Sequence, residues 1–321
     1  MVSTIRYRSS RLGTIVYLST LTIVGATVVW YALRGRHPTS PESGAAVSPG
    51  EELACDTVAT NQLSALPDAS GLAISRRDSN VLWSLNDSGA PVVLALSTDG
   101  RLLGRVRITG ASVSDWEDVS VASCGAASCL YVADSGDSGG TQRNDVVIYR
   151  VREPSPQDRE TEPAEVFDAA YPDGEDHEVE ALFVVDERLF LVTKGHPSLM
   201  FALPRELTPG SIATLERIGV VPTERFLATT IPRRTRITDA ETSPDGRWVS
   251  LRTNEALLLY RSDDIVHHQL DDFWHADLRP LGEPRGEGVA ISDAGDVYVA
   301  GEGGSVNRPG TFAHLRCALP E

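Results

Sequence analysis

The chain has 321 residues, of which 41% are hydrophobic and 23% are charged, and its formal net charge is −16. Residues 1–37 hold five Arg and no acid, so the remainder carries 24 basic against 45 acidic residues, a net charge of −21. Phosphate groups repel such an acidic globular part, which excludes nucleic acid and anionic lipid as its partners.

The first predicted element is an uncharged apolar segment of 22 residues, 12–33. A helix of this length spans a bilayer. Three Arg precede the segment, and Trp30 and Tyr31 lie where interfacial aromatic side chains are typical. We therefore expect a single-pass signal anchor in the cell membrane, with residues 1–11 cytoplasmic and the domain extracytoplasmic. A cleaved signal peptide is the alternative.

A tether and one domain follow. Residues 34–52 are rich in Pro, Ser, Gly and Ala and show no apolar periodicity, which is typical of a flexible linker. Residues 53–321 have the length of one all-β domain rather than of two smaller domains.

A short phrase, in which an acidic or Gly-rich entry runs into an apolar strand, occurs five times in this domain. Its copies are Ala69-Ser-Gly-Leu-Ala-Ile, Asp115-Trp-Glu-Asp-Val-Ser-Val, Glu178-Val-Glu-Ala-Leu-Phe-Val, Thr238-Asp-Ala-Glu-Thr-Ser and Gly286-Glu-Gly-Val-Ala-Ile. A turn and a second β-rich strand follow each copy, and the spacing of roughly 45 to 60 residues is typical of four-stranded propeller blades. The repeats predict an all-β fold, a single β-propeller of five blades. Six blades is the alternative, with a further unit inside the long second or third repeat.

Three turn sequences support the strand assignment. Ser97-Thr-Asp-Gly100, Ser243-Pro-Asp-Gly246 and Ser292-Asp-Ala-Gly295 each combine early turn formers with a final Gly. Such combinations are expected in hairpins that join two strands.

The four cysteines suggest a pairing. Cys124 and Cys129 flank a predicted hairpin, while Cys55 and Cys317 lie at the two ends of the repeat region. The fifth repeat supplies only about three strands, so residues 54–66 are expected to complete its blade. Disulfides between Cys55 and Cys317 and between Cys124 and Cys129 would then form in an oxidising, extracytoplasmic compartment. Four free buried thiols in a cytosolic protein are the alternative.

Several phrases give the chain a family resemblance. They include Asn86-Asp-Ser-Gly, Ala133-Asp-Ser-Gly-Asp, Ile148-Tyr-Arg-Val-Arg-Glu-Pro and Gly286-Glu-Gly-Val-Ala-Ile. With these phrases the chain resembles a family of exported bacterial β-propellers without an established reaction, and more remotely the TolB-like and gluconolactonase-like propellers. The gluconolactonase-like resemblance implies a metal in the central funnel and calcium-dependent hydrolysis. The chain departs from it in having five repeats rather than six.

Propeller geometry predicts which polar residues meet. Because the first two strands of a blade are antiparallel, residues that open the first strand and residues that close the second share one rim. The residues opening first strands are Glu117, Asp118, Glu178, Glu180, Asp239, Glu241 and Glu287. The residues closing second strands are Asn86, Asp87, Asp134, Asp137, Lys194, His196, Arg252, Glu255 and Glu302.

Crowded carboxylates raise one another's pKa unless a cation neutralises them, and an oxygen-only set suits Ca²⁺ or Mg²⁺. We expect Asp118, Asp239 and Glu287 as metal ligands. Glu117, Glu180, Lys194 and Arg252 are the expected catalytic residues, the two cations orienting an oxyanion. The rim residues expected to bind a ligand are Asn86, Asp87, Asp134, Asp137, Glu178, Glu241 and Glu302. The alternative is that these acids cap strand ends and accept backbone hydrogen bonds.

These residues predict an acidic funnel that binds Ca²⁺ and, through it, a small anionic or polar ligand, with hydrolysis of a lactone or ester as the reaction. The metal would polarise a carbonyl or activate water. A non-catalytic extracytoplasmic scaffold that binds a protein partner is the first alternative. A glycosidase with paired carboxylates is the second. Whether the chain is an enzyme stays open at this stage.

Overall fold

The structure is a computed structural model, and it describes residues 50–137, 145–223, 235–304 and 308–321. The predicted membrane segment 12–33, the N-terminal residues 1–11 and nearly all of the linker 34–52 lie outside these ranges. Within the ranges, no helix is both long and apolar enough to cross a membrane. Pro49–Glu321 form one compact unit.

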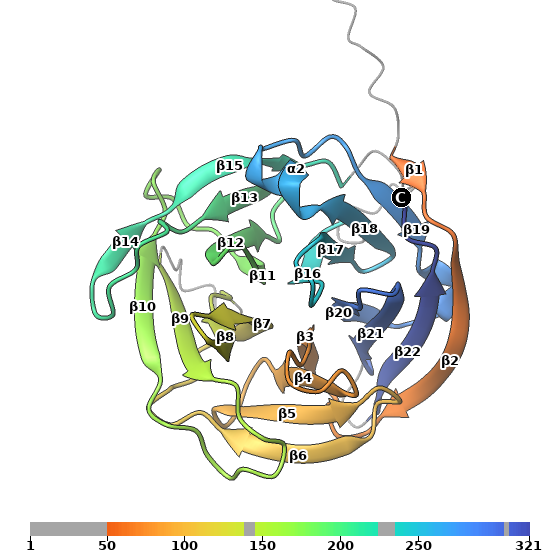
Figure 1. Cartoon of the computed structure of the whole chain (residues 1–321), viewed down its shortest axis with the longest axis horizontal. Coiled ribbons are helices and arrows are strands. Elements are labelled where there is room, and N and C mark those ends of the chain that lie inside the picture. Colours follow the sequence, from red (N-terminus) through yellow and green to blue (C-terminus); the bar gives the residue numbers. More distant parts are fainter. Residues whose placement is uncertain (1–49, 138–144, 224–234, 305–307) are drawn as a thin grey trace, which may run out of the picture. The chain divides into compact units, whose positions relative to one another are not determined.

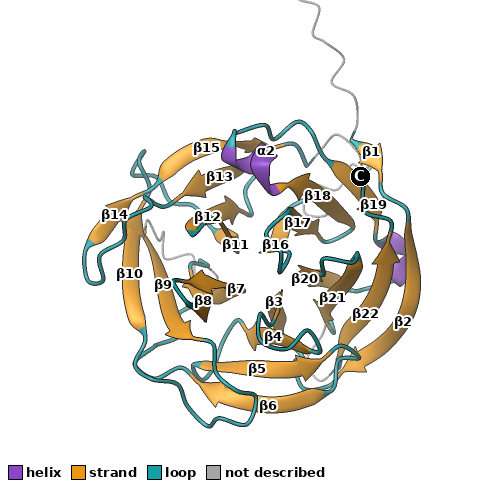
Figure 2. Ribbon diagram, viewed as in Figure 1, coloured by secondary structure: helices purple, strands orange, loops and turns teal. Residues whose placement is uncertain are grey.

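This unit is a five-bladed β-propeller, in which five sheets surround a central axis (Figure 1). Strands make up nearly all of the regular structure in Figure 2, apart from α2 (Ser262–Val266) and the 3₁₀-helix η2 (Arg279–Leu281), which lie in the loops on either side of β19. The prediction of five blades is therefore confirmed, and the alternative of six is wrong.

Each blade begins with its innermost strand and proceeds outward. Blade 1 consists of β3 (Ala69–Ile74), β4 (Val81–Asn86), β5 (Val92–Ser97) and β6 (Leu102–Arg107). Blade 2 consists of β7 (Trp116–Cys124), β8 (Ala127–Asp134), β9 (Asp145–Arg152), β10 (Glu165–Ala170) and β14 (Ile212–Thr214). Blade 3 consists of β11 (Val179–Val185), β12 (Arg188–Thr193), β13 (Ser198–Ala202) and β15 (Glu216–Val221).

The last two blades include the beginning of the described chain. Blade 4 consists of β16 (Ile237–Thr242), β17 (Trp248–Thr253), β18 (Ala256–Arg261), β19 (Trp274–Asp277) and β1 (Glu51–Glu52). Blade 5 consists of β20 (Arg285–Ile291), β21 (Asp296–Glu302), β22 (Gly310–Cys317) and β2 (Cys55–Leu63). The short parallel additions β1 and β14 were not expected from the sequence.

The ring closes where β2 pairs antiparallel with β22. Cys55 lies opposite Cys317 in this register, and the two cysteines form a disulfide. Cys124 and Cys129 form a second disulfide across the β7–β8 hairpin. Both predicted pairings and the N-terminal strand closure are confirmed, and none of the four cysteines is free.

The predicted turns join strands as the sequence indicated. Gly100, Gly246 and Gly295 have φ angles of 81°, 78° and 85°. Each glycine donates its N–H to the carbonyl of the serine three residues earlier, at 2.8, 2.9 and 3.1 Å. Only glycine adopts this left-handed backbone without strain, so these positions fix the hairpin turns.

The core lies between neighbouring blades. Trp83 and Trp116 are fully buried between blades 1 and 2, and Trp248 is buried between blades 4 and 5. Phe183 and Phe190 stack at a centroid distance of 5.2 Å and face blade 4. Each such side chain contributes about 1.5–3 kcal/mol by leaving water. The tryptophans therefore hold the blades together.

Candidate functional site

All five innermost strands lose register with their neighbours at the same place, near the beginning of the strand. The interruptions lie at Ser70/Leu72, Trp116/Asp118, Val179/Ala181, Ile237/Asp239 and Gly286/Gly288. A β-bulge leaves one residue out of the ladder and redirects its side chain. The residues left out are Gly71, Glu117, Glu180, Thr238 and Glu287. Three blades thus place a glutamate at the same level around the axis.

One residue beyond the bulges, two aspartates join the blades to one another. Asp239 accepts hydrogen bonds from the backbone N–H groups of Leu72 (3.1 Å) and Val289, which belong to the innermost strands of blades 1 and 5. Asp118 accepts one from the N–H of Leu182 (2.6 Å), on the innermost strand of blade 3. A hydrogen bond also joins the two carboxyl groups. All five innermost strands are therefore connected through this pair.

Burial controls the protonation of this pair. It raises the pKa of Asp239 to about 7, although the hydrogen bond from Asp118 opposes the shift. Burial, followed by the negative charge of Asp239, raises the pKa of Asp118 well above its usual range. Asp118 therefore keeps its proton and donates it to Asp239. The prediction of both residues as metal ligands is wrong, because backbone N–H groups and this shared proton occupy their oxygens.

Farther along the axis, Glu241 and Arg76 join blades 1, 2 and 4. Glu241 is fully buried and accepts hydrogen bonds from Ser120 Oγ (2.5 Å) and the N–H of Val121 (3.2 Å). Burial raises its pKa to about 8. Arg76 donates to the carbonyls of Val121 (3.1 Å) and Pro244. Glu241 was expected at the rim, but it lies two residues beyond Asp239, and each strand residue advances about 3.3 Å along the axis.

The opposite end of the axis carries what we call the mouth cluster, which consists of Glu117, Glu178, Glu180, Glu287 and Lys194. Lys194 Nζ lies 2.5 Å from Glu180 Oε1 and 3.2 Å from Glu178 Oε1. One carboxylate oxygen from each of Glu117, Glu178 and Glu180 lies within 4.8 Å of the others. The sequence prediction that these residues meet is confirmed by this geometry.

Glu117 is the exceptional member of the mouth cluster. Glu117 is only 8% exposed, yet no donor within the described ranges forms a hydrogen bond to its carboxylate. Burial, followed by the charges of Glu180 and Asp115, raises its pKa well above the usual range. Gly136 packs against this carboxylate so closely that a Cβ there would lie 2.0 Å from Glu117 Oε1. A buried, unpaired acceptor is costly for the fold.

The other mouth residues are also shifted. Burial raises the pKa of Glu180 to about 8, although Lys194 opposes the shift. Burial and then the charge of Glu180 raise the pKa of Glu287 well above its usual range. Burial disfavours the charge of Lys194, but Glu180 outweighs it and the pKa of the ammonium is raised. Lys194 is therefore a cation at any physiological pH.

The negative field extends beyond the mouth cluster onto the rim. Burial raises the pKa of Asp87 and Glu302, and Arg285, 2.9 Å from Glu302, opposes the shift there. The negative charges of Asp68, Asp87, Asp115, Glu178, Glu180 and Glu302 raise the pKa of one or more of four neighbours, Asp87, Glu117, Glu287 and Glu302. The positive charges of Lys194, Arg252 and Arg285 oppose these pKa shifts.

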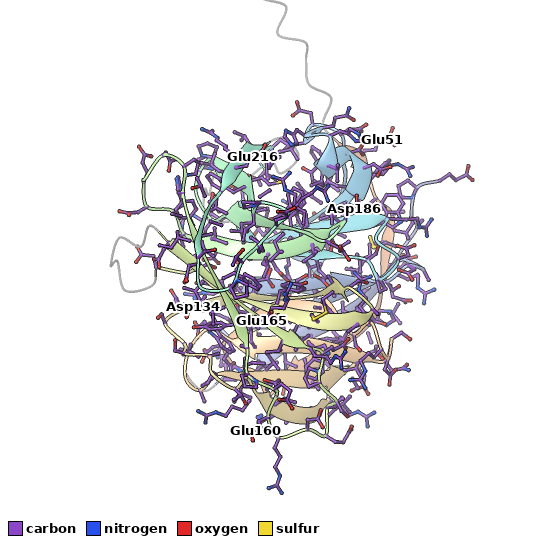
Figure 3. All side chains as sticks on the ribbon, turned by 60° about the vertical axis from the view of Figure 1, so that its left-hand side comes forward. Glu51, Asp134, Glu160, Glu165, Asp186 and Glu216 are labelled. Atoms are coloured by element: carbon purple, nitrogen blue, oxygen red, sulfur yellow. A yellow bond between two sulfur atoms is a disulfide. The ribbon has the colours of Figure 1, made fainter. Side chains whose placement is uncertain are left out.

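Other predicted rim residues serve the framework. Asp134 is buried and accepts the N–H groups of Ser114 (3.0 Å) and Asp115 (3.1 Å), so it fixes the loop before β7. Figure 3 shows it on the opposite side of the blades from Asp186, which lies in the β11–β12 turn. Asn86 ends β4 opposite Ala69, as expected for a rim residue.

The remaining predicted residues lie in loops and turns. Asp137 is half-buried at the end of a described range, and His196 is exposed in the loop after Lys194. Glu255 lies in the β17–β18 turn, where its N–H is 3.3 Å from Thr253 Oγ1.

Arg252 also differs from its prediction. It is fully buried, donates to the carbonyls of Gly288 (2.8 Å) and Ala300 (3.0 Å), and forms an ion pair with Glu283. Its guanidinium is therefore occupied by blades 4 and 5, and the expectation that it orients an oxyanion is wrong. The rule that places strand ends at the rim does not say whether a side chain points toward the axis or between blades.

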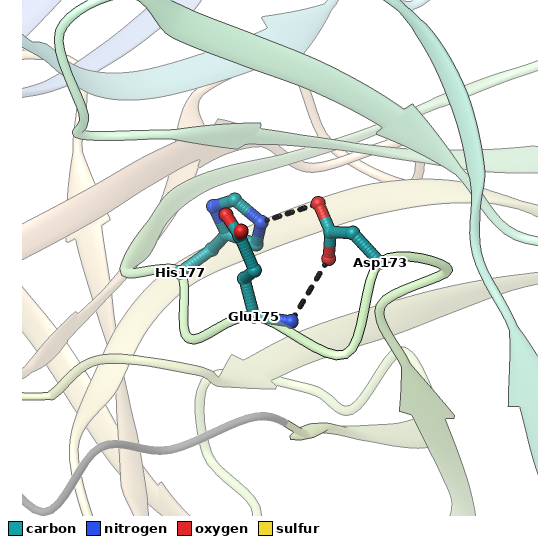
Figure 4. A group of neighbouring side chains, drawn as sticks. All are labelled: Asp173, Glu175 and His177. Carbon is teal, nitrogen blue, oxygen red and sulfur yellow. Dashed lines mark hydrogen bonds and ion pairs between the residues drawn. The ribbon is translucent and has the colours of Figure 1, made fainter.

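A second group of potential ligands lies in the loop between β10 and β11 (Figure 4). His177 Nε2 lies 3.1 Å from Asp173 Oδ2, and Asp173 Oδ1 accepts the N–H of Glu175 at 3.1 Å. The imidazole packs on Tyr171 and Phe201 at centroid distances of 4.7 and 5.5 Å. His177 and Asp173 thus have polar partners, in contrast to Glu117.

Two larger grooves lie away from the axis. One of about 630 Å³ is lined by residues that include Tyr131, Arg150 and Leu207, and one of about 450 Å³ by residues that include Val221 and Leu270. None of the glutamates at the bulges lines either groove, so we place the candidate site by its chemistry rather than by cavity size.

Sequence reasoning missed Asp115, Gly136 and Arg285 as neighbours of the site. Asp115 stands in one copy of the repeated phrase, so the repeat itself contained the signal for it. Gly136 had no signal of this kind, because its close packing on Glu117 and Asp115 depends on the fold.

No family model and no curated protein matches the chain. Among solved structures, the PQQ-bound aldose sugar dehydrogenase from Streptomyces coelicolor is similar with a TM-score of 0.47 and 11% identity, over 84% of this chain and 100% of the other. A gluconolactonase from Xanthomonas campestris has a TM-score of 0.43 and 11% identity, over 84% and 98%. A glutaminyl cyclase from Myxococcus xanthus has a TM-score of 0.46 and 10% identity, over 84% and 100%. A gluconolactonase is thus among the similar structures, as the remote resemblance implied, but similarity this low supports no statement about activity.

Proposed function

We propose that the mouth cluster binds a divalent cation, Ca²⁺ by preference, and through it a small anionic or polar ligand. The observation that carries the proposal is Glu117, a residue only 8% exposed, whose carboxylate has an oxygen within 4.8 Å of oxygens of two other carboxylates and accepts no hydrogen bond from a described residue. A fold tolerates such a group when a ligand compensates it.

The donor set fits a hard cation. Glu117, Glu178 and Glu180 offer only oxygen, with one atom of each within 4.8 Å of the others. Ca²⁺ binds oxygens at about 2.3–2.6 Å, so two oxygens on opposite sides of the ion are about 5 Å apart. The predicted cation site is therefore retained, but its proposed ligands become Glu117, Glu178 and Glu180 in place of Asp118, Asp239 and Glu287.

The chemistry proposed for this site is hydrolysis of a lactone or ester. A bound cation there would polarise a carbonyl oxygen or lower the pKa of a water molecule. Glu287, which also belongs to the mouth cluster, would act as the general base that takes a proton from water. Lys194 supplies the positive charge that orients an anionic group. These are proposed roles for this chain's own side chains.

The proposal also includes a location. The two disulfides suit an oxidising compartment, and the apolar segment 12–33 would hold the domain at the outer face of the cell membrane. Protease added to intact spheroplasts should then remove the propeller. Full protection of the domain would contradict this location.

Calcium titration of the purified full chain by calorimetry tests the cation site. Wild type should bind Ca²⁺ below millimolar concentration, and Glu117→Gln should weaken binding by at least about 10-fold, because one charged ligand is lost. Glu175→Gln, in the exposed loop of Figure 4, is the matched control and should leave the affinity unchanged.

The outcomes separate the candidate functions. If wild type binds neither Ca²⁺ nor Mg²⁺ at millimolar concentration, the cation site is wrong and a non-catalytic scaffold accounts better for the rim. If it binds, a screen of lactones and esters follows. Turnover that Glu117→Gln and Glu287→Gln abolish would establish an enzyme.

A further inference from the structure

Lys194 occupies the position that the proposed cation needs. It is the single lysine of the chain, and its Nζ contacts one oxygen each of Glu178 and Glu180. Glu178 and Glu180 also supply two of the three oxygens that converge within 4.8 Å. An ion within about 2.6 Å of those oxygens would lie close to the ammonium, and two cations so near each other repel strongly.

We propose, on the basis of the proposed cation site, that Lys194 is a resident cation which the divalent ion displaces, and that the displaced ammonium then binds the anionic group of the ligand. The ligand class that fits is a small carboxylate, or an ester or lactone whose carbonyl oxygen gains negative charge. Cation binding precedes ligand binding in this scheme.

The surroundings of Lys194 permit this movement. The side chain is 30% exposed, and its two ammonium contacts are both to carboxylates. The residue directly follows β12, where the chain leaves the sheet, while its backbone N–H stays bonded to the carbonyl of Glu178 at 2.8 Å. A flexible four-carbon stem on a fixed backbone can swing between two positions.

The charge of the mouth explains the order of binding. The positive charge of Lys194 acts to lower the pKa not only of its partner Glu180 but also of Asp87, Glu117 and Glu287. An anion that approaches this surface is repelled while Lys194 is the main neutralising charge. A divalent ion on Glu117, Glu178 and Glu180 adds positive charge and frees the ammonium at the same time. The anion therefore binds only after the divalent ion.

The single lysine allows a direct test. When the full chain is labelled with ¹³C,¹⁵N-lysine, its NMR spectrum contains a single lysine Hε–Cε correlation, that of Lys194, because no other lysine is present. Saturating Ca²⁺ should move this signal toward the position of lysine in an unfolded peptide. Acetate, used as a carboxylate probe, should then move it a second time, but should have no effect without Ca²⁺.

Substitutions give the second measurement. Lys194→Met keeps the length of the stem and removes the competing charge, so its Ca²⁺ affinity should rise by about 10-fold, while acetate binding is lost. Lys194→Arg should lower the Ca²⁺ affinity, because a guanidinium holds two carboxylates in a fixed fork. Arg279→Met, which removes an exposed cation paired with Asp277 at the end of β19, is the matched control and should change the affinity by less than about threefold.

The results distinguish failure of this inference from failure of the cation site. If calorimetry shows no Ca²⁺ binding to wild type, the cation site itself is wrong and the displacement falls with it. If Ca²⁺ binds but the Lys194 signal stays in place, or Lys194→Met binds Ca²⁺ no more tightly than wild type, the cation site stands and the displacement is wrong. If acetate binds to Ca²⁺-loaded Lys194→Met as it does to wild type, the ammonium does not hold the anion.

Discussion

The propeller axis contains two groups of buried acids that differ by a single step along the same strands. Asp118 and Asp239 stand one residue after a bulge, and backbone N–H groups of other blades fill their oxygens. Glu117 and Glu180 stand at the bulge itself and face each other and Lys194. Burial thus has two different meanings: the first group completes the fold, whereas in the second Glu117 is an acceptor that no described donor uses.

The comparison gives a general rule for acidic propeller axes. A buried carboxylate that accepts hydrogen bonds from backbone N–H groups of neighbouring strands has a structural role, which is enough to explain its burial. A buried carboxylate without a donor is destabilising by itself, and its presence indicates a ligand or a proton. Glu117 belongs to the second kind, and the following experiments test whether the division holds.

The largest expected effect is on stability at the axis. Asp239→Ala leaves three backbone N–H groups without their acceptor, those of Leu72, Ala240 and Val289. Since each buried unpaired group costs about 1–3 kcal/mol, the free energy of unfolding should fall by at least about 3 kcal/mol. Urea unfolding measures this loss. Glu117→Gln removes a carboxylate that no described donor bonds, so its free energy of unfolding should be unchanged or higher. An equal loss in both variants would show that the two groups of acids do not differ in this way.

The second effect in size is stabilisation by the cation. Ligand that binds the folded state at 100 times its Kd adds about 2.7 kcal/mol to the free energy of unfolding. Ca²⁺ should therefore raise the unfolding temperature of wild type and of Glu175→Gln equally, and that of Glu117→Gln by less, because its affinity is lower. Differential scanning calorimetry with and without the ion measures the difference. A Ca²⁺ effect as large in Glu117→Gln as in wild type would place the ion elsewhere.

The third effect is on pH dependence. Burial raises the pKa of Glu241 to about 8 and that of Asp239 to about 7, whereas both titrate near 4 in an unfolded chain. Between pH 4 and pH 8 the folded chain therefore binds more protons than the unfolded chain. The contribution of these two groups to the free energy of unfolding is complete below pH 4 and is lost as the pH rises through 7 and 8. We expect the cation-free protein to lose at least about 1 kcal/mol between pH 5 and pH 9. Urea unfolding at both pH values, each with Glu241→Gln alongside, measures it; a stability that rises with pH contradicts the assignment.

The smallest expected effect concerns Gly136. A methyl group there would lie 2.0 Å from Glu117 Oε1 and 2.4 Å from Asp115 Oδ2, so Gly136→Ala must push the Glu117 carboxylate aside. We expect a loss of Ca²⁺ affinity of about 3- to 10-fold with little change in the unfolding temperature. Gly125→Ala, in an open turn of the same blade, is the control for Ca²⁺ affinity only, because the φ of 67° at Gly125 makes alanine strained there and lowers stability by itself. Equal affinity in both variants would show that the position of Glu117 does not matter.

The sequence was sufficient for the fold because the fold is repetitive. The five copies of the phrase marked the five innermost strands, and the cysteine positions marked the closure. The copies also contain Gly71, Glu117, Glu180 and Glu287, which the structure finds at equivalent bulges.

The sequence did not predict which acids serve the fold and which face the mouth. Glu117 and Asp118 are neighbours of the same chemical type, and only the bulge between Trp116 and Asp118 determines that one faces the mouth and the other the backbone of blade 3. The partner of Arg252, Glu283, lies 31 residues away in an unrelated loop. Contacts of this kind depend on three-dimensional placement, which no local pattern of residues contains.

The disulfide between β2 and β22 has a mechanical consequence. A force that pulls on the chain before residue 50 enters the propeller through β1 and the first residue of β2, Cys55, and passes there into Cys317 of the last strand. The sulfur atoms carry the load past the remaining β2–β22 hydrogen bonds, which would otherwise open one after another from the pulled end. With the disulfide formed, a tethered domain would resist separation of β2 from β22, where the ring closes. With the disulfide reduced, β2 would separate from β22 at a much lower force.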